Sequence, residues 1–223
     1  IDIFYDGLQI ETWEGRVQGF TTNTSIFSTS TERNYTTFYR RIQPLLKGRP
    51  FSLQVWHDDG TEQIQAIHAI DPTIFVKIPI VNSRGQYNDE LISYAVMRGI
   101  PINVTCIYTA DQITHLRALL EGSTAPEIIS VFGGPISDTG ISPDSIVQHA
   151  VHLFSGRSHS RILWAGCREV YTIHRAEALG CHIITVPDAI MEKLSNMKSL
   201  DQMSLERAQI FQRHAVDGML TIK

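Results

Sequence analysis

The sequence is poor in the features that mark disulfide-rich, membrane and nucleic-acid-binding proteins. Its three cysteines, Cys106, Cys167 and Cys181, show no C-x-x-C spacing and cannot all pair within one chain, which favours reduced thiols in a cytoplasmic setting. The longest apolar runs are far shorter than the roughly 20 residues that span a bilayer. With 19 basic and 23 acidic residues, a net charge of −4 and no clustered Lys/Arg segment, the chain is expected to bind a small molecule rather than nucleic acid or a membrane surface.

The sequence does contain a regular alternation of two kinds of segment. Its 223 residues, 43% hydrophobic and 19% charged, suffice for one domain with a buried core. Stretches with helical periodicity separate most of eight short apolar runs, which predict strands at 1–6, 17–23, 51–56, 74–79, 102–108, 127–133, 161–166 and 182–187. Eight alternating strand–helix units in this length predict a single (β/α)8 TIM barrel. A doubly wound open sheet is the alternative, although no G-x-G-x-x-G or P-loop motif follows a strand.

The segment after about residue 195 has the pattern of one more amphipathic helix, with Met203, Ala208, Ile210 and Phe211 as candidate packing residues. Residues 1–223 are therefore expected to form a single barrel domain that ends in a C-terminal helical extension. This helix could lie across the barrel mouth, or it could join neighbouring subunits into a homo-oligomer.

One lysine interrupts the apolar alternation of a predicted barrel strand. In the run at 74–79, Ile74, Val76 and Ile78 form the set that faces the helices, which places Phe75 and Lys77 in the barrel interior. A lysine is costly to bury in its charged form, and the neutral amine is the nucleophile that forms a Schiff base with a ketone or aldehyde. The alternative is a lysine that extends out of the strand end or pairs with a carboxylate.

Other strands bring polar side chains to the same interior. The alternation predicts inward positions for Asp6, Asn23, Gln54, Asn103 and Thr105. Most of them lie near the C-terminal ends of strands, the face on which barrel active sites are built. A group of small polar and acidic residues around one lysine favours a catalytic site over unrelated interior polar residues.

The order of these residues resembles the transaldolase family, including the small transaldolases and fructose-6-phosphate aldolases, over nearly the whole chain. The matching segments are Asp6, TTNTS at 21–25, QVW at 54–56, VKIP at 76–79, NVT at 103–105, SVFGGPI at 130–136 and AGCRE at 165–169. The resemblance implies that Lys77 forms an imine with a ketose and that Asp6 gives and takes the proton at the carbon–carbon bond. It also implies that Asn23 and Asn103 hold the hydroxyls of a dihydroxyacetone unit, and that Gln54 and Thr105 position a proton-relaying water.

The sequence departs from the family pattern at several positions of the expected site. Gln54 matches the aldolase branch rather than the transaldolases that carry Glu, whereas Phe132 stands where that branch carries a catalytic Tyr, so transfer and cleavage both stay open. Pro135 replaces the family Arg and Gly166 replaces the family Ser, which leaves Arg168 as the charged partner for a phosphate. Weaker recognition of phosphorylated sugars is therefore expected.

Two further residues complete the expected substrate site. Ser130 opens the SVFGGPI segment and is taken as a substrate-binding residue. Trp164 stands where the family usually has a small residue. Because it lies two residues before Gly166, it is expected on the same side of the strand, where its ring would reshape the pocket. Stacking of a sugar on this ring and simple filling of barrel volume are the two interpretations.

The sequence thus predicts an enzyme that cleaves, forms or transfers an aldol unit between a ketose donor and an aldose acceptor through a lysine Schiff base. His149 and His152 share a helical face, but no Cys or acidic ligand stands at metal spacing, so neither a metal nor an organic cofactor is expected. The alternative function is a non-catalytic sugar-binding or scaffold descendant of the same family.

Overall fold

The computed structural model describes residues 1–222. Its eight parallel strands close into a barrel in which each strand pairs with the next and the last pairs with the first, which confirms the predicted (β/α)8 fold. The strands are β1 Asp2–Asp6, β2 Gly19–Thr21, β3 Phe51–Gln54, β4 Phe75–Pro79, β5 Ile102–Ile107, β6 Glu127–Val131, β7 Ser160–Trp164 and β8 Ile183–Val186.

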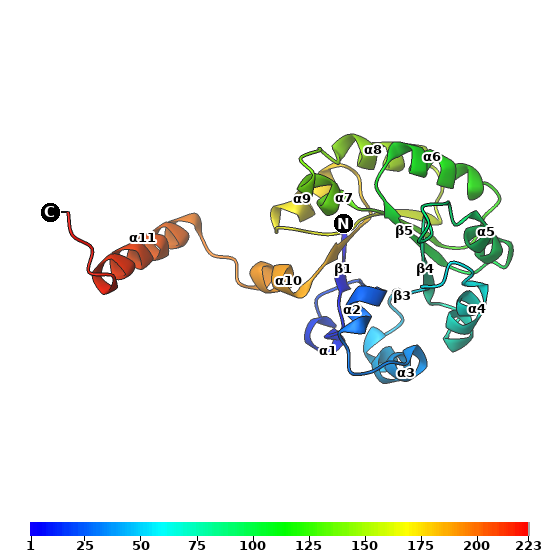
Figure 1. The fold of residues 1–223 in the computed structure, drawn as a ribbon, viewed down its shortest axis with the longest axis horizontal. Helices are drawn as coiled ribbons and strands as arrows, with labels where there is room; N and C mark the ends of the chain where they lie inside the picture. Colours follow the sequence, from blue (N-terminus) through cyan, green and yellow to red (C-terminus); the bar gives the residue numbers. More distant parts are fainter. Residues whose placement is uncertain (223) are drawn as a thin grey trace. The chain divides into compact units, whose positions relative to one another are not determined.

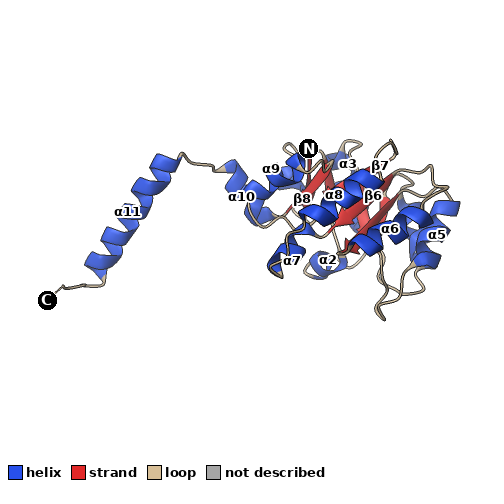
Figure 2. Ribbon diagram, turned by 90° about the horizontal axis from the view of Figure 1, so that it is seen from above, coloured by secondary structure: helices blue, strands red, loops and turns tan. Residues whose placement is uncertain are grey.

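Helices connect the strands and cover the outside of the barrel (Figures 1 and 2). The helices of the chain are α1 Ile10–Trp13, α2 Thr24–Ser28, α3 Tyr35–Leu46, α4 Thr61–Ile70, α5 Asp89–Met97, α6 Ala110–Leu119, α7 Gly133–Asp138, α8 Asp144–Leu153, α9 Tyr171–Ala178, α10 Asp188–Ser195 and, after the barrel, α11 Leu200–Asp217. Local sequence sets several helix starts. Asn34 caps α3 by accepting a hydrogen bond from the Thr37 amide, and Thr109 with Gln112 forms a capping box on α6.

The alternation along the strands divides the barrel into two layers of packing. Phe4, Ile128, Leu163, Ala165 and Ile183 form an interior cluster from four neighbouring strands, and Phe75 of β4 packs against it. The residues that alternate with Phe75, namely Ile74, Val76 and Ile78, are fully buried between barrel and helices. Lys77 shares the parity of Phe75, so its side chain starts toward the interior, as the sequence predicts.

A bulge changes the direction of the chain near the end of β5. The register with β6 shifts between Val104 and Ile107, and Cys106 has a φ of 61°. Val104 and Ile107 are both fully buried although they are three residues apart, because the bulge inserts one extra residue between them. Strict alternation from Val104 would place Cys106 in the helix-facing set, and the bulge breaks that alternation at Cys106.

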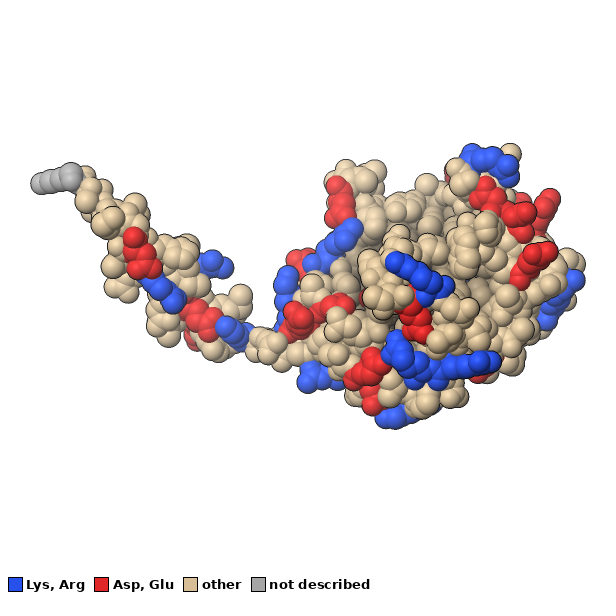
Figure 3. Space-filling model, turned by 60° about the horizontal axis from the view of Figure 1, so that its bottom comes forward, with Lys and Arg blue, Asp and Glu red and all other residues tan. Residues whose placement is uncertain are grey.

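The chain divides into two compact units, Ile1–Ile190 and Met191–Lys223. The barrel belongs to the first, and the helix expected after residue 195 is α11 in the second. No residue of α11 is buried, and its exposed apolar side chains include Leu200, Met203, Leu205, Phe211 and Val216. Within residues 1–222, no helix has both the length and the apolar character needed to cross a membrane. On the face shown in Figure 3, basic and acidic side chains are interspersed.

Candidate active site

Lys77 lies in the barrel wall between two other predicted site residues. On β4 it is in register with Gln54 of β3 and with Asn103 of β5. The residue is 7% exposed, and its Nζ donates a hydrogen bond of 3.4 Å to the carbonyl oxygen of Thr22. No ion pair joins this amine to a carboxylate within residues 1–222. Because lysine is rarely buried without an acidic partner, the amine is better explained by chemistry than by stability.

Asp6 ends β1 at the same face of the barrel. Its Oδ1 accepts a hydrogen bond of 2.7 Å from the Thr21 hydroxyl of the neighbouring strand β2. This bond fixes one carboxylate oxygen and leaves the other to act on a ligand. Thr21 was not predicted as a site residue, although it belongs to the TTNTS segment, because a hydroxyl that orients a carboxylate has no sequence signature of its own.

Asn103 is held at both ends of its amide by serine hydroxyls. Ser130 Oγ donates to Asn103 Oδ1 at 2.7 Å, and Asn103 Nδ2 donates to Ser52 Oγ at 3.1 Å. All three side chains are buried and form a continuous polar row across β3, β5 and β6. Ser52 was not predicted, yet it lies two residues before Gln54 and therefore on the same side of β3. The row leaves one Asn103 N–H and the Ser52 hydroxyl proton as donors for a sugar hydroxyl.

The residues expected to bind water and sugar hydroxyls differ in the hydrogen bonds that they already form within the protein. Thr105 Oγ1 is buried without a hydrogen-bond partner among the described residues, so it is available to a water or a substrate. Gln54 Nε2 donates to Thr24 Oγ1 at 3.4 Å. Asn23 uses its Oδ1 to cap α2 by accepting from the Ile26 amide at 2.9 Å, which leaves its Nδ2 as a donor at the mouth.

Cys106 is a site-facing residue that the sequence argument did not select. Burial raises the pKa of the Cys106 thiol, and the nearby positive charge of Lys77 opposes that rise.

The expected phosphate end of the site is filled by close packing between the start of α7 and the loop after β7. The Gly134 amide donates to the Ala165 carbonyl oxygen at 3.2 Å, and a Cβ on Gly134 would lie 1.7 Å from the Gly166 carbonyl oxygen. Gly166 has a φ of 76°, and a Cβ there would lie 2.6 Å from Pro135 Cδ. The two substituted residues therefore pack on each other. Arg168, the remaining cation, forms an ion pair of 2.6 Å with Asp138.

Trp164 does not lie in the interior, and the interpretation of its ring as part of the substrate pocket is wrong. Leu163 belongs to the interior cluster, so its neighbour Trp164 faces the helix layer. The ring is 1% exposed, lies next to the Gly133 backbone of α7 and has the Arg175 guanidinium of α9 over its face at 5.9 Å. Leu163 and Ala165 on either side of Trp164 both belong to the interior cluster, so alternation places the ring on the opposite side, against the helices.

Phe132 occupies the rim of the interior just after β6. It packs against the interior cluster, and its ring stacks on Tyr108, with centroids 5.2 Å apart. Burial raises the pKa of the Tyr108 hydroxyl. An aromatic pair thus covers the position where a tyrosine hydroxyl stands in the aldolase branch that the sequence resembles.

The fold and these residues define a class of protein: a (β/α)8 barrel with a buried, unpaired lysine among carboxylate, amide and hydroxyl groups at the C-terminal ends of its strands. Among residues 1–222 no group of three or more His, Cys, Asp or Glu side chains is arranged to hold a metal ion. The family model described as Transaldolase/Fructose-6-phosphate aldolase matches residues 3–221. The chain belongs to this family, which supports an aldolase-type enzyme that acts on sugars.

Individual relatives agree with this assignment. The chain is 27% identical over 185 residues to a probable transaldolase of Desulforudis audaxviator (strain MP104C), covering 81% of each protein. It is 30% identical over 187 residues to a probable transaldolase of Streptococcus equi subsp. zooepidemicus (strain MGCS10565), again covering 81% of each. Among solved structures, a 3-hexulose-6-phosphate synthase superposes with a TM-score of 0.61 at 12% identity, covering 86% of this chain and 92% of that one. That likeness shows the barrel fold alone.

Proposed function

We propose that the chain is a class I aldolase or transaldolase in which Lys77 forms a Schiff base with a ketose. The observation that carries this proposal is the buried Lys77 amine, which has no carboxylate partner and is flanked in register by Gln54 and Asn103. The probable transaldolases that the chain resembles support the same reaction class.

The proposed chemistry begins with attack of the Lys77 amine on the ketose carbonyl and loss of water, which gives a protonated imine. Asp6 then takes the proton of the hydroxyl beside the scissile bond while the carbon–carbon bond breaks. The bonding electrons move into the imine, an aldehyde leaves, and an enamine of the dihydroxyacetone unit stays on Lys77. Thr105 and Gln54 position the water that moves protons as the imine forms and hydrolyses.

Transfer and cleavage differ only in the fate of that enamine. In transfer the enamine carbon attacks an aldose acceptor, and in cleavage the carbon takes up a proton before the imine is hydrolysed. Phe132 supplies no hydroxyl for that protonation, and its ring is stacked on Tyr108, which favours transfer. Gln54 matches the aldolase branch. Assays with a ketose donor, in the presence and absence of an aldose acceptor, separate the two outcomes.

We also propose that the substrate lacks the usual terminal phosphate. Pro135 and Gly166 pack on each other where the family has a guanidinium and a hydroxyl, and Arg168 is already paired with Asp138. Charge-assisted hydrogen bonds contribute roughly 1.5–3 kcal/mol each, so the loss of two predicts at least about a hundredfold weaker use of phosphosugars than a complete site would give.

The test of this specificity compares kcat/KM for fructose 6-phosphate and fructose, each with and without an aldose acceptor. The plain sugar is expected to be used at least as well as the phosphorylated one, in the native chain and in Arg168→Ala. A strong preference for fructose 6-phosphate that Arg168→Ala leaves unchanged would show that another cation, such as Arg84, binds the phosphate. Arg84 belongs to the loop after β4, and its guanidinium lies 3.9 Å from the Asp58 carboxylate.

The exposed helix α11 supports a homo-oligomer as part of the proposal. An 18-residue helix with no buried residue and several exposed leucine, methionine and phenylalanine side chains gains stability when another surface covers it. A second copy of the chain is the proposed partner. Light scattering of the full chain and of a chain ending at residue 198 would test it, with a smaller assembly expected for the shorter chain.

A further inference from the structure

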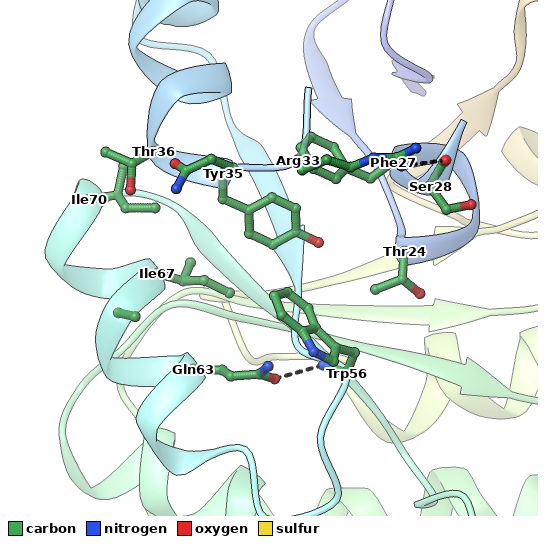
Figure 4. Close-up of a pocket in the computed structure, with 12 residues that line it drawn as sticks. Thr24, Phe27, Ser28, Arg33, Tyr35, Thr36, Trp56, Gln63, Ile67 and Ile70 are labelled. Carbon is green, nitrogen blue, oxygen red and sulfur yellow. Dashed lines mark hydrogen bonds between the residues drawn. The ribbon is translucent and has the colours of Figure 1, made fainter. Parts of the chain in front are cut away.

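A cavity of about 420 Å³ lies outside the catalytic residues, between the start of α3 and the exposed side of α4 (Figure 4). None of Asp6, Lys77, Asn103 or Thr105 lines it. Its volume is in the range of cavities that hold small organic ligands, which begins at about 300 Å³. The family reaction as proposed above makes no use of this cavity.

Aromatic rings form the middle of the cavity. Tyr35 meets Phe27 edge-on, with centroids 4.7 Å apart, and meets Trp56 edge-on at 5.6 Å. Ile67 and Ile70 of α4 lie on the side facing these rings (Figure 4). Trp56 is 58% exposed, which is unusual for so large a ring and leaves a face free for a ligand. A flat apolar group suits this arrangement because aromatic and aliphatic walls bind it by burial of apolar area.

The polar wall of the cavity is positively charged. Arg33 lines it and donates one hydrogen bond of 2.7 Å to the Ser28 carbonyl oxygen, and no carboxylate within residues 1–222 forms an ion pair with it. The cavity is also lined by Asn34, Tyr35 and Thr36, the N-cap and first residues of the 12-residue helix α3. Asn34 already accepts a hydrogen bond from the Thr37 amide, and the positive end of the helix dipole still favours negative charge near Tyr35 and Thr36. Both features select an anion over a neutral group.

The cavity adjoins the strand residue Gln54 through two of its lining residues. The Tyr35 hydroxyl, whose pKa burial raises to about 12, donates to the Gln54 carbonyl oxygen at 3.0 Å. Thr24 lines the cavity on one side and accepts from Gln54 Nε2 on the other. A ligand in the cavity would therefore contact the residues that hold Gln54 while lying apart from the Lys77 amine.

We propose that this cavity is a second ligand site, which takes a flat apolar ring bearing one anionic group, such as an aromatic carboxylate. The ring packs between Tyr35, Trp56 and Ile67, and the anionic group lies against Arg33 and the start of α3. The site is independent of the Schiff-base reaction, so its test needs no turnover.

Fluorescence of Trp56 provides the readout. The two other tryptophans, Trp13 and Trp164, are 7% and 1% exposed, so a ligand that protects tryptophan from acrylamide acts on Trp56. Phenylacetate is the anionic probe, and benzyl alcohol is its uncharged counterpart. In the full chain, phenylacetate is expected to protect Trp56 at concentrations about tenfold lower than benzyl alcohol, as one charge-assisted hydrogen bond predicts.

Two variants and one control separate the contributions. Arg33→Gln is expected to weaken phenylacetate binding about tenfold and to leave benzyl alcohol binding unchanged, whereas Arg40→Gln, on α3 but outside the cavity, is expected to change neither. Ala66→Phe fills the space from the exposed side of α4 and is expected to weaken both probes. Equal binding of the two probes, or an Arg33→Gln variant with unchanged binding, would overturn the proposal. So would a Trp56 that acrylamide does not reach in the full chain, because another segment would then occupy the cavity.

Discussion

The two ends of the barrel contain buried polar groups in opposite states. At the N-terminal end, Glu127 of β6 is fully buried and accepts hydrogen bonds from Arg157 at 3.1 and 3.2 Å and from Ser160 at 2.6 Å. At the C-terminal end, the Lys77 amine is buried with a single long hydrogen bond of 3.4 Å, and Thr105 Oγ1 has no partner among the described residues. The Glu127 carboxylate has satisfied its charge with Arg157 and Ser160, whereas the Lys77 amine and the Thr105 hydroxyl keep capacity for a ligand.

This difference separates residues that stabilise the barrel from residues that act on a ligand. A buried carboxylate whose oxygens are all bonded has no capacity left for chemistry, and removing its partner exposes an uncompensated charge. A buried amine with few hydrogen-bond partners lowers the stability of the folded protein, but it is able to react. The same fold therefore concentrates stability at one end of the strands and reactivity at the other, as barrel enzymes do.

Replacement of the lysine gives the largest expected effect. Lys77→Met should abolish aldol cleavage or transfer, because methionine cannot form an imine. The apolar side chain fits an interior position without a buried amine, so the melting temperature should stay the same or rise. Activity with the substrate panel and thermal unfolding, measured on the same preparation, test both parts. An active variant would refute the role of Lys77.

Replacement at the other end should produce the opposite result. Glu127→Gln leaves the Arg157 charge without its partner and is expected to lower the free energy of unfolding by about 3 kcal/mol. Catalysis per folded molecule should be unchanged. Urea unfolding monitors the loss, and Glu121→Gln, at an exposed position nearby, is the matched control. A large activity loss without destabilisation would show that the two ends are not separate.

Loss of Ser52, which accepts a hydrogen bond from Asn103, should reduce activity less than loss of Lys77. Ser52→Ala removes the acceptor of the Asn103 amide, so the amide is free to turn away from the substrate. KM for the donor should rise several-fold with little change in kcat, because the effect is on positioning of the sugar hydroxyl. Ser160→Ala, which lies at the stable end, should lower stability and leave KM unchanged. A fall in kcat alone for Ser52→Ala would contradict a positioning role.

The smallest expected effect is a pH dependence at the stable end. Burial lowers the pKa of His182 from its ordinary value of 6.5, and Arg161 adds to that effect. In the neutral ring, His182 Nδ1 accepts a hydrogen bond from the Ile162 amide. A group with a lowered folded-state pKa contributes stability above its unfolded pKa, and this contribution is lost as pH falls below about 6.5. Between pH 7 and pH 5 the free energy of unfolding should decrease less in His182→Asn than in the native chain, by under about 1 kcal/mol. The exposed-site control His214→Asn should show the same decrease as the native chain.

Most of the fold could be predicted because the strands are short apolar runs, several of them rich in β-branched residues, separated by stretches with helical period. The alternation of side chains along a strand also placed Phe75 and Lys77 correctly. It fails at Cys106, because a bulge inserts a residue that no sequence period reveals. Trp164 was misassigned because it was grouped with Gly166, whereas Leu163 and Ala165 are the inward residues. Ser52 was missed because its bond to Asn103 crosses from β3 to β5, and contacts between non-adjacent strands leave no local pattern.

The central claim is that a buried amine at the open end of the barrel is the nucleophile. Borohydride reduction of the full chain in the presence of dihydroxyacetone, followed by peptide mass mapping, tests it directly. The account predicts one stable adduct, located on Lys77 and absent from Lys77→Met. No adduct, or an adduct confined to Lys47, Lys193 or Lys198, would contradict it.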